Sequence, residues 1–396
     1  MSNRRPRVFM MDLWATVPYY TAYLSRALLA EGVDVMVGSI TYYLDPTCYS
    51  SRGIKVDPGL IDIVGKFRLP RLLRRVMKML EALINLAALT VRFMFSPPDA
   101  VHVQYLPMLK WRLPLDFWFL EFCRKRGAKI VLTVHDLLPH DTGQTYKNTF
   151  LKLYELSDRM ICHSDHVKAL LELEFTVSSE KISVIPHGPF FYDLPSTGVE
   201  QTRSRVGMES DAMLVLWQGI IFPYKGVDLL LRAWQRVESS GSKAYLMIAG
   251  TGALELLKQI RDLIDELQLK RVKLDFRFIS VLELVTLYRA ADVVVYPYRA
   301  ITTSGALATG LALGKTIVAS DLPVFRELLT NRENALVIDP EDTGKLADAL
   351  IELSQDVMLR KQLSESVREM KFGDQSWITI AQKTKMTYEN ASHSQK

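Results

Sequence analysis

Short runs of apolar, often β-branched residues alternate with longer amphipathic segments along this sequence. The runs are almost continuously apolar, which is typical of strands buried on both faces in parallel sheets. The segments between them carry apolar residues at helical spacing, so the repeated unit is strand, helix, strand. The sequence therefore predicts an α/β fold built from doubly wound parallel sheets.

Twelve strands are expected, six in each half of the chain. In the first half they are Val8–Met11, Val33–Gly38, Ala100–Val103, Lys129–Val134, Met160–Cys162 and Ile182–Ile185. In the second half they are Met213–Gln218, Ala244–Ala249, Val272–Phe278, Val293–Tyr296, Thr316–Ala319 and Ala335–Ile338. Helical patterns cover Val227–Val237, Ala253–Leu267 and Val281–Ala290, and the last begins with Ser280 and Glu283 at the spacing of a capping box.

The length of the chain, 396 residues, fits two domains better than one. The stretch Leu194-Pro195-Ser196-Thr197-Gly198 breaks the strand and helix pattern, and polar residues follow it. We therefore expect a first domain over residues 1–195 and a second that begins at residue 196. Ligands of such sheets bind at the carboxyl ends of the strands, so a cleft between the domains is the expected site.

Composition excludes several classes of protein. A net charge of only +5 gives no general polyanion-binding signature, so nucleic acid is not an expected partner. The three cysteines (Cys48, Cys123 and Cys162) are odd in number and far apart, as expected of reduced thiols in the cytoplasm. The longest uncharged stretch of the most hydrophobic region, Ala82–Val91, is half of the roughly 20 residues that span a bilayer. We expect a cytoplasmic protein that does not cross a membrane.

Two segments of the second half have the chemistry of a phosphate site. Lys225 and Gly226 lie in the turn after the strand Met213–Gln218, where an ammonium group reaches the carboxyl end of the sheet. Residues 300–314 contain no charge, and Ser304-Gly305 begins a helix whose backbone N–H groups attract anions. Taken alone, Ser304-Gly305 is better explained as a tight helix start packed under a neighbour. Together with Lys225 in the same domain, it predicts a diphosphate site.

Seven short motifs follow one another along nearly the whole chain. They are Thr133–Leu137, Val184–Gly188, Gly219–Asp228, Ile248–Gly252, Ser280–Asp292, Ser304–Ser320 and Ser376-Trp377. Each is weak alone, but in this order they resemble the family 4 retaining glycosyltransferases of GT-B fold. The resemblance implies two Rossmann-like domains that face a central cleft. Residues 1–195 would bind the acceptor, residues 196–375 the nucleotide sugar, and the helix 376–396 would pack back on the first domain.

The resemblance also implies site residues. His135 would face the donor sugar, and Asp136 is a conceivable acid or base, although front-face attack in retaining members requires none. The donor-binding positions would be Gly219, Lys225, Gly250, Ile279, Thr303, Ser304, Gly305, Ala306 and Thr309. Judged from the residues alone, His135 is equally a loop histidine with Asp136 as its partner. No cofactor and no metal ion are expected, because Lys225 and the helix amides neutralise the diphosphate.

Several positions depart from the family pattern. The family's two glutamates, eight residues apart, are replaced here by Ile301 and Thr309. Thr309 would hold a ribose hydroxyl group more weakly than a carboxylate does. Ile220 stands in place of an arginine, and the loop Asp12–Tyr19 is not glycine-rich. These differences indicate either a divergent branch of the family or impaired catalysis. The presence of the phosphate-binding residues and of His135 favours a divergent branch of the family.

The segment Lys66–Val91 predicts a basic amphipathic helix. Its apolar stripe consists of Leu69, Leu72, Leu73, Val76, Leu80, Leu83, Ile84, Ala87 and Val91. The bases on the other side are Arg68, Arg71, Arg74, Arg75 and Lys78, and no acidic residue precedes Glu81. One interpretation is a core helix with a solvated basic face. The other, favoured by five bases without an acid, is contact with an anionic membrane surface, where each base contributes about 1 kcal/mol.

The sequence thus predicts a metal-independent glycosyltransferase at the inner face of the membrane. It would move a hexose-type sugar, with retention, from a UDP- or GDP-sugar to a lipid-linked saccharide acceptor in polysaccharide or glycolipid assembly. Two alternatives stay open: an enzyme with a soluble acceptor, and an inactive nucleotide-sugar-binding subunit, which Ile301 and Thr309 would explain.

Overall fold

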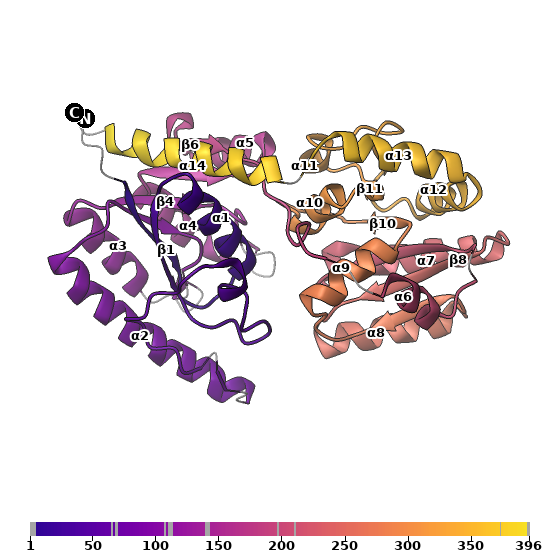
Figure 1. Cartoon of the computed structure of the whole chain (residues 1–396), viewed down its shortest axis with the longest axis horizontal. Helices are drawn as coiled ribbons and strands as arrows, with labels where there is room; N and C mark the ends of the chain where they lie inside the picture. Colours follow the sequence, from indigo (N-terminus) through magenta and orange to yellow (C-terminus); the bar gives the residue numbers. More distant parts are fainter. Residues whose placement is uncertain are drawn as a thin grey trace. The chain divides into compact units, whose positions relative to one another are not determined.

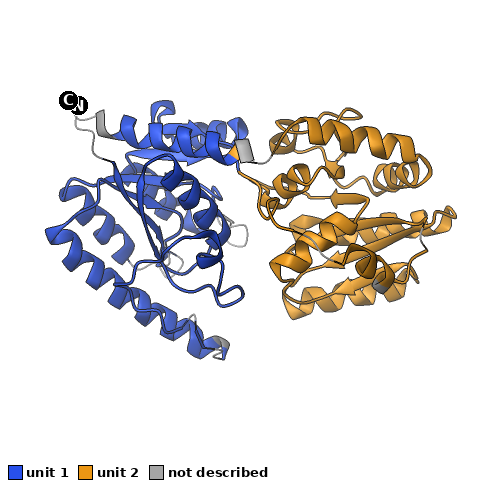
Figure 2. Ribbon diagram, viewed as in Figure 1, with its two compact units in different colours: residues 1–187, 377–396 blue, residues 188–376 orange. Residues whose placement is uncertain are grey.

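The computed structural model describes residues 5–64, 66–67, 70–106, 108–109, 114–138, 143–195, 198–209, 211–372 and 374–393. Arg68 and Leu69 of the predicted basic helix lie outside these ranges, as do Ser196 and Thr197 of the expected boundary. The chain forms two compact units (Figure 2). Unit 1 comprises Met1–His187 and Trp377–Lys396, and unit 2 comprises Gly188–Ser376. The division thus falls earlier than the expected boundary after residue 195.

Unit 1 contains sheet A, whose six strands have the order β2-β1-β3-β4-β5-β6 and are all parallel. Their bounds are Arg7–Asp12 (β1), Asp34–Ser39 (β2), Ala100–Val103 (β3), Lys129–Thr133 (β4), Arg159–Cys162 (β5) and Ile182–Val184 (β6). The strand order reverses between β1 and β3. Doubly wound folds bind ligands at such a switch point, outside the carboxyl ends of the strands.

The helices of unit 1 flank this sheet. They are α1 (Pro18–Ala30), α2 (Arg71–Phe95), α3 (Leu115–Lys125), α4 (Lys147–Leu156), α5 (Asp165–Phe175) and α14 (Asp374–His393), with short 3-10 turns η1 (Ser50–Arg52), η3 (Gly143–Tyr146) and η4 (Ser179–Lys181). In Figure 1, α2 is the long helix beside α3. From the end of the chain, α14 returns to this unit, where Trp377 stacks on Tyr23 of α1 with ring centroids 5.5 Å apart.

Unit 2 contains sheet B, also parallel, with the order β12-β11-β10-β7-β8-β9. Its strands are Met213–Gln218 (β7), Ala244–Ala249 (β8), Val272–Asp275 (β9), Val293–Tyr296 (β10), Thr316–Ser320 (β11) and Leu336–Ile338 (β12). Its helices are α6 (Val199–Val206), α7 (Val227–Ser239), α8 (Leu254–Glu266), α9 (Val281–Ala290), α10 (Gly305–Ala312), α11 (Pro323–Arg326), α12 (Thr343–Gln355) and α13 (Val357–Glu369), with the turn η5 (Pro223–Lys225). This is the Rossmann strand order, and its switch point lies between β7 and β10.

The predicted strands are confirmed, because continuous apolar runs are buried from both sides. Every residue of β4 and of β11 is buried. The largest difference is β9, which ends at Asp275 rather than at Phe278. Arg277 turns back there and donates to the carboxylates of Asp275 and Glu283 at 3.0 Å. Glu283 also accepts the N–H of Ser280 at 3.2 Å, so the predicted capping box at the start of α9 is confirmed.

Candidate functional site

The turn after β7 carries Lys225 to the carboxyl edge of sheet B, at its switch point. Gly219 has a φ of 144°, and a Cβ atom there would lie 3.0 Å from the Lys225 Nζ atom. The ammonium group is therefore next to the end of the strand. Gly226, the residue before α7, has a φ of 65°, and a Cβ atom there would collide with the carbonyl oxygen of Pro297 after β10. Only glycine allows the two loops to approach this closely.

The Lys225 ammonium is a half-buried cation. Within the described ranges no hydrogen bond or ion pair joins it to a protein group, and it lies 5.8 Å from the centroid of the Tyr298 ring. Burial lowers the pKa of Lys225 to about 8. Burying a charge without a counter-charge costs free energy, so this position favours an anionic ligand.

A neighbouring base, Arg299, is fully engaged by the protein. It follows β10 and donates to both carboxylate oxygens of Asp228 at 2.9 and 2.7 Å and to Glu341 at 2.8 Å. These contacts fasten the loop after β10 to the start of α7. Arg299 therefore does not replace the cation that the family carries at the position of Ile220, whose side chain is exposed.

The start of α10 lies at the same edge of sheet B. Ser304 is its N-cap, and the serine hydroxyl accepts the N–H of Leu307 at 3.1 Å. The carbonyl oxygen of Ala306 accepts hydrogen bonds from the hydroxyl groups of Tyr288 and Tyr296 at 3.1 and 2.8 Å. These bonds fix the first turn, whose N–H groups have no partner within the helix. Thr303, Ser304, Gly305 and Ala306, all predicted donor contacts, are half-buried here.

Three further predicted donor residues also belong to unit 2. Gly250 follows β8 with a φ of 146°, and a Cβ atom there would collide with the carbonyl oxygen of Gly219. Ile279 is buried just before α9. Thr309 is buried in α10, where its hydroxyl donates to the Gly305 carbonyl at 2.8 Å and accepts the N–H of Phe190 at 3.1 Å. Both hydrogen-bonding functions of Thr309 are thus used within unit 2, and its ribose contact stays a prediction.

In unit 1, His135 follows β4 at the carboxyl edge of sheet A. Its Nε2 atom lies 3.0 Å from the Gln104 Oε1 atom, and its ring centroid lies 4.9 Å from that of Tyr20. Burial, and then the neighbouring His163, His187 and His102, hold the pKa of His135 well below its usual range. The ring is therefore neutral near pH 7. The side chain of Asp136, in contrast, is exposed.

The loop between β1 and α1 uses a carboxylate where the family has glycines. The Asp12 side chain accepts the N–H groups of Thr16 and Val17 at 2.8 and 2.9 Å. Burial raises the pKa of Asp12 to about 6. Neither Asp12 nor Gln104 was among the predicted site residues. The signal for both is a polar residue at the end of a buried strand, next to the switch point of sheet A.

The basic residues of α2 do not form one solvated face. Arg74 lies over the ring of Tyr43, 4.4 Å from its centroid, and the Lys78 ammonium donates to the Trp14 carbonyl at 3.1 Å. Arg75 is exposed, and Arg71 is the first residue of the helix. Arg68 lies outside the described residues. The prediction of one solvated basic face is therefore wrong, because Arg74 and Lys78 contact Tyr43 and Trp14.

The apolar stripe of α2 faces away from the core of unit 1. Leu72, Ile84 and Phe95 keep 77%, 52% and 81% of their surface exposed. Leu73, Val76, Leu80, Val91 and Met94 are exposed as well. The opposite side of the helix is buried, and its polar groups bond the chain segment before the helix. Glu81 accepts the N–H of Val64 at 3.3 Å, and Asn85 accepts that of Ile61 at 2.7 Å.

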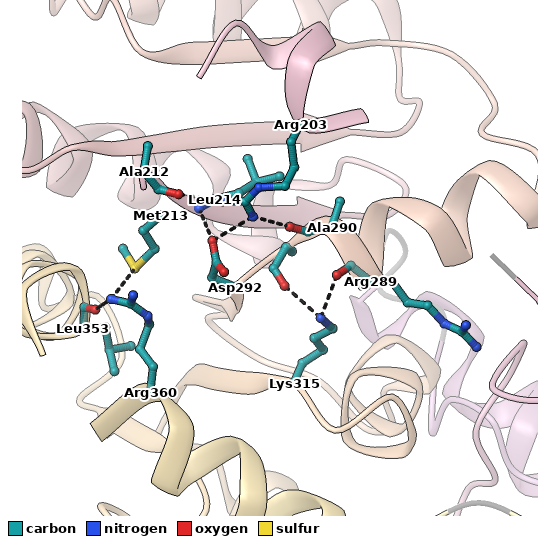
Figure 3. Close-up of polar contacts among 11 residues, drawn as sticks. Arg203, Ala212, Met213, Leu214, Arg289, Ala290, Asp292, Lys315, Leu353 and Arg360 are labelled. Carbon is teal, nitrogen blue, oxygen red and sulfur yellow. Dashed lines mark hydrogen bonds and ion pairs between the residues drawn. The ribbon is translucent and has the colours of Figure 1, made fainter. Parts of the chain in front are cut away.

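A hollow of about 820 Å³ lies at the opposite, amino-terminal edge of sheet B and is rich in bases (Figure 3). Arg203 pairs with Asp292 at 3.0 Å. The Lys315 ammonium donates to the carbonyl groups of Arg289 and Ala291 at 3.1 and 2.8 Å. These bonds tie α6 to the sheet and close the carbonyl end of α9. Arg203 and Lys315 are therefore engaged by the framework of unit 2.

Two kinds of feature are absent from the described ranges. No helix in them is long and apolar enough to cross a bilayer. No group of three or more histidine, cysteine, aspartate or glutamate side chains in them is arranged to hold a metal ion.

Models of known protein families match both units of the chain. A family model described as Glycosyltransferase Family 4 matches residues 17–188, and one described as Glycosyl transferases group 1 matches residues 213–356. The chain belongs to glycosyltransferase family 4. The first match covers most of unit 1 and the second most of unit 2. Membership of family 4 confirms the resemblance on which the site residues were predicted.

Individual family 4 relatives are distant. An uncharacterized glycosyltransferase of Methanocaldococcus jannaschii is 24% identical over 259 residues, 64% of this chain and 65% of that protein. An O-antigen chain mannosyltransferase of Salmonella typhimurium is 26% identical over 230 residues, 57% of this chain and 60% of that protein. The chain thus spans less than two thirds of the length of these two relatives. HepE of Anabaena, solved with UDP and glucose, has 18% identity and a TM-score of 0.74 over 98% of this chain and 100% of HepE. This likeness confirms the predicted GT-B fold class.

Proposed function

We propose that this family 4 protein transfers a hexose-type sugar, with retention, from a UDP- or GDP-sugar to a lipid-linked saccharide acceptor at a membrane surface. The observation that carries the proposal is the Lys225 ammonium, half-buried at the switch point of sheet B without a counter-charge among the described residues. A donor diphosphate would supply that charge. The N–H groups at the start of α10, at the same edge, would share its oxygens.

The solved relative supports the choice of donor. HepE was crystallised with UDP and glucose, and its fold matches this chain over nearly the whole length. A thermal-shift screen of the purified protein against UDP, GDP and their common sugars tests the donor class. We expect one nucleotide to raise the unfolding temperature, because a ligand that binds only the folded state stabilises it. No shift with any of them, up to millimolar concentration, would count against the proposal.

The exposed apolar stripe of α2 supports a membrane-associated acceptor. A row of exposed leucine, isoleucine and phenylalanine side chains is costly in water and suits the interface of a bilayer. Arg75 and Lys66 are both exposed and would meet anionic headgroups. The Salmonella relative is an O-antigen chain mannosyltransferase. We therefore propose peripheral association with the inner face of the membrane.

Nucleotide binding should weaken at alkaline pH. Burial lowers the pKa of Lys225 to about 8 in the free protein, and a bound diphosphate would raise it by stabilising the charged form. Affinity is then full below pH 8 and falls above it, approaching tenfold per pH unit. Titration calorimetry from about pH 7 to about pH 9.5 measures this.

Lys225→Arg is the control for this pH dependence. Arginine keeps its charge throughout this pH range, so the nucleotide affinity of the variant should stay level above pH 8. Burial also lowers the pKa of Lys315 to about 8, but both proteins contain Lys315 and its contribution cancels in the comparison. The same decline in both proteins would contradict the role of Lys225.

Transfer should not require a divalent cation. The Lys225 ammonium and the first N–H groups of α10 would neutralise the leaving diphosphate in the way that a metal ion does in other transferases. We expect full activity in EDTA once the donor and acceptor are known. Activity that EDTA abolishes and magnesium or manganese restores would refute this.

A further inference from the structure

Gln104 is a buried polar residue that directly contacts the candidate catalytic histidine. It follows β3 at the switch point of sheet A and keeps only 3% of its surface exposed. Its Oε1 atom lies 3.0 Å from the His135 Nε2 atom. Its amide nitrogen donates to the Met10 sulfur at 3.1 Å and to the Thr133 hydroxyl at 3.3 Å. Its backbone N–H donates to the Met11 carbonyl at 2.9 Å, so the main chain is fixed as well.

These partners determine the orientation of the Gln104 amide group, that is, which of its two ends is oxygen and which is nitrogen. The thioether sulfur of Met10 can only accept a hydrogen bond, so the NH₂ group of Gln104 faces it. The amide oxygen then faces His135, and an amide oxygen can only accept. The Nε2 atom of His135 must therefore carry the proton in this contact.

A buried chain of hydrogen bonds holds Gln104 in place. Thr133 of β4, which receives the Gln104 amide, also lies 2.8 Å from the His102 Nε2 atom. The His102 Nδ1 atom lies 2.7 Å from the Tyr388 hydroxyl of α14. Burial lowers the pKa of His102 to about 3, so this ring is neutral. The contact with His135 thus rests on strands β3 and β4 and on the C-terminal helix.

The charged and titratable groups around His135 all leave its ring neutral. His163 follows β5 with a centroid 5.5 Å away, and burial lowers its pKa to about 4. His187, His102 and His163 each disfavour a positive charge on His135. Tyr20 of α1 covers the ring, and Asp136 next to it is exposed. Gln104 adds a hydrogen-bond acceptor to this environment without adding a negative charge.

We propose that Gln104 is a positioning residue that fixes the Nε2–H tautomer and the ring orientation of His135. The role of this arrangement in transfer rests on the proposed function and on the family resemblance, which implies that His135 faces the donor sugar. A neutral ring with one defined N–H can present the same face to the sugar in every turnover. In the other tautomer, the ring nitrogen that donates a hydrogen bond and the one that accepts would be exchanged at that face.

Nitrogen-15 NMR of the full chain, labelled at histidine, tests the contact directly. We expect the His135 ring to be neutral with its proton on Nε2 from about pH 6 to about pH 8. Assignment comes from the signal that disappears in His135→Gln. Q104L removes the acceptor, so a second tautomer should appear. A proton on Nδ1 in the parent protein, or a tautomer unchanged in Q104L, would overturn the proposal.

Q104E is the matched variant, because it keeps the acceptor and adds a charge. The tautomer should stay the same while the pKa of His135 rises by about 1–3 units, as beside other opposite charges. In transfer assays the acid limb of the kcat profile should move to higher pH by the same amount. Q104L should lower kcat about tenfold and leave the donor KM unchanged, as expected when one hydrogen bond is lost in the transition state only.

The two readouts separate this proposal from the proposed function. If Q104L does not fold, Q104E still decides, since an unshifted His135 pKa would overturn the contact. If the parent transfers no sugar from any donor, the NMR result still tests the tautomer, and the failure counts against the proposed function. Unchanged kcat and pH profile in both variants would overturn the positioning role.

Discussion

Lys225→Met should weaken nucleotide binding and at the same time stabilise the free protein. The affinity for UDP or GDP, whichever binds, should fall about 30-fold, which corresponds to about 2 kcal/mol for one charge-assisted contact. Without ligand, the unfolding temperature should stay level or rise, because methionine fills the same space without burying an unpaired charge. Titration calorimetry and thermal unfolding of the same preparation measure both effects.

Lys345→Met provides the matched control. Lys345 is an exposed lysine of unit 2, on α12, and pairs with Asp339. Its substitution should change neither property beyond the small effect of a surface ion pair. If Lys225→Met binds nucleotide as tightly as the parent does, the assignment of the diphosphate site is wrong. If it binds weakly because the free protein is unfolded, the fall in unfolding temperature will reveal that.

Replacing the exposed stripe of α2 should release the protein from anionic vesicles. The variant carries glutamine at Leu72, Val76, Leu80 and Ile84, all exposed in the structure. If each side chain contributes on the order of 1 kcal/mol at the interface, vesicle affinity should fall about a thousandfold. Co-sedimentation with vesicles of anionic lipid measures it. Nucleotide affinity should be unchanged, because Lys225 and α10 belong to unit 2.

A control variant loses exposed apolar side chains from other helices instead. Leu173, Leu254 and Met358 are exposed to 81%, 75% and 71% but belong to three other helices. Glutamine at these positions should leave vesicle binding intact. Binding of the parent should also fall with salt, because exposed charges are screened within about 8 Å at physiological ionic strength. If the α2 variant and the control variant bind vesicles equally well, or if the parent protein does not bind them, a soluble acceptor is favoured.

The structure also determines which bases are useful in that experiment. Arg74 and Lys78 contact Tyr43 and Trp14, so glutamate at either position would disturb the fold of unit 1 as well as its surface charge. Arg75→Glu and Lys66→Glu are the cleaner changes, because both side chains are exposed.

The sequence predicts the strands well because their physical signal is local. A continuous apolar run such as β11 can only be satisfied by burial on both faces, and this holds whatever the neighbouring strands are. Lys225 is predicted for the same reason, since the strand before it and the glycine after it lie within one short segment. Such features require no knowledge of which strands pair.

The contacts that the sequence does not reveal join distant segments. Gln104 meets His135 only because β3 and β4 are neighbours in sheet A, and the chain leading to Tyr388 requires α14 to return to this unit. The helical period of α2 predicts its exposed apolar stripe as one row but does not say which side of the helix is buried. Polar groups decide that, because Glu81 and Asn85 satisfy backbone N–H groups of the preceding segment.

This family 4 chain should be an active transferase despite Ile301 and Thr309. The most direct measurement incubates the purified protein with the nucleotide sugar that the thermal-shift screen selects and with membrane lipid extract, and follows the sugar label. If the chain is an active transferase, the label appears in the lipid fraction, the product retains the anomeric configuration of the donor, and Lys225→Met loses both. Nucleotide binding at Lys225 with neither transfer nor donor hydrolysis would contradict it and identify the chain as a nucleotide-sugar-binding subunit.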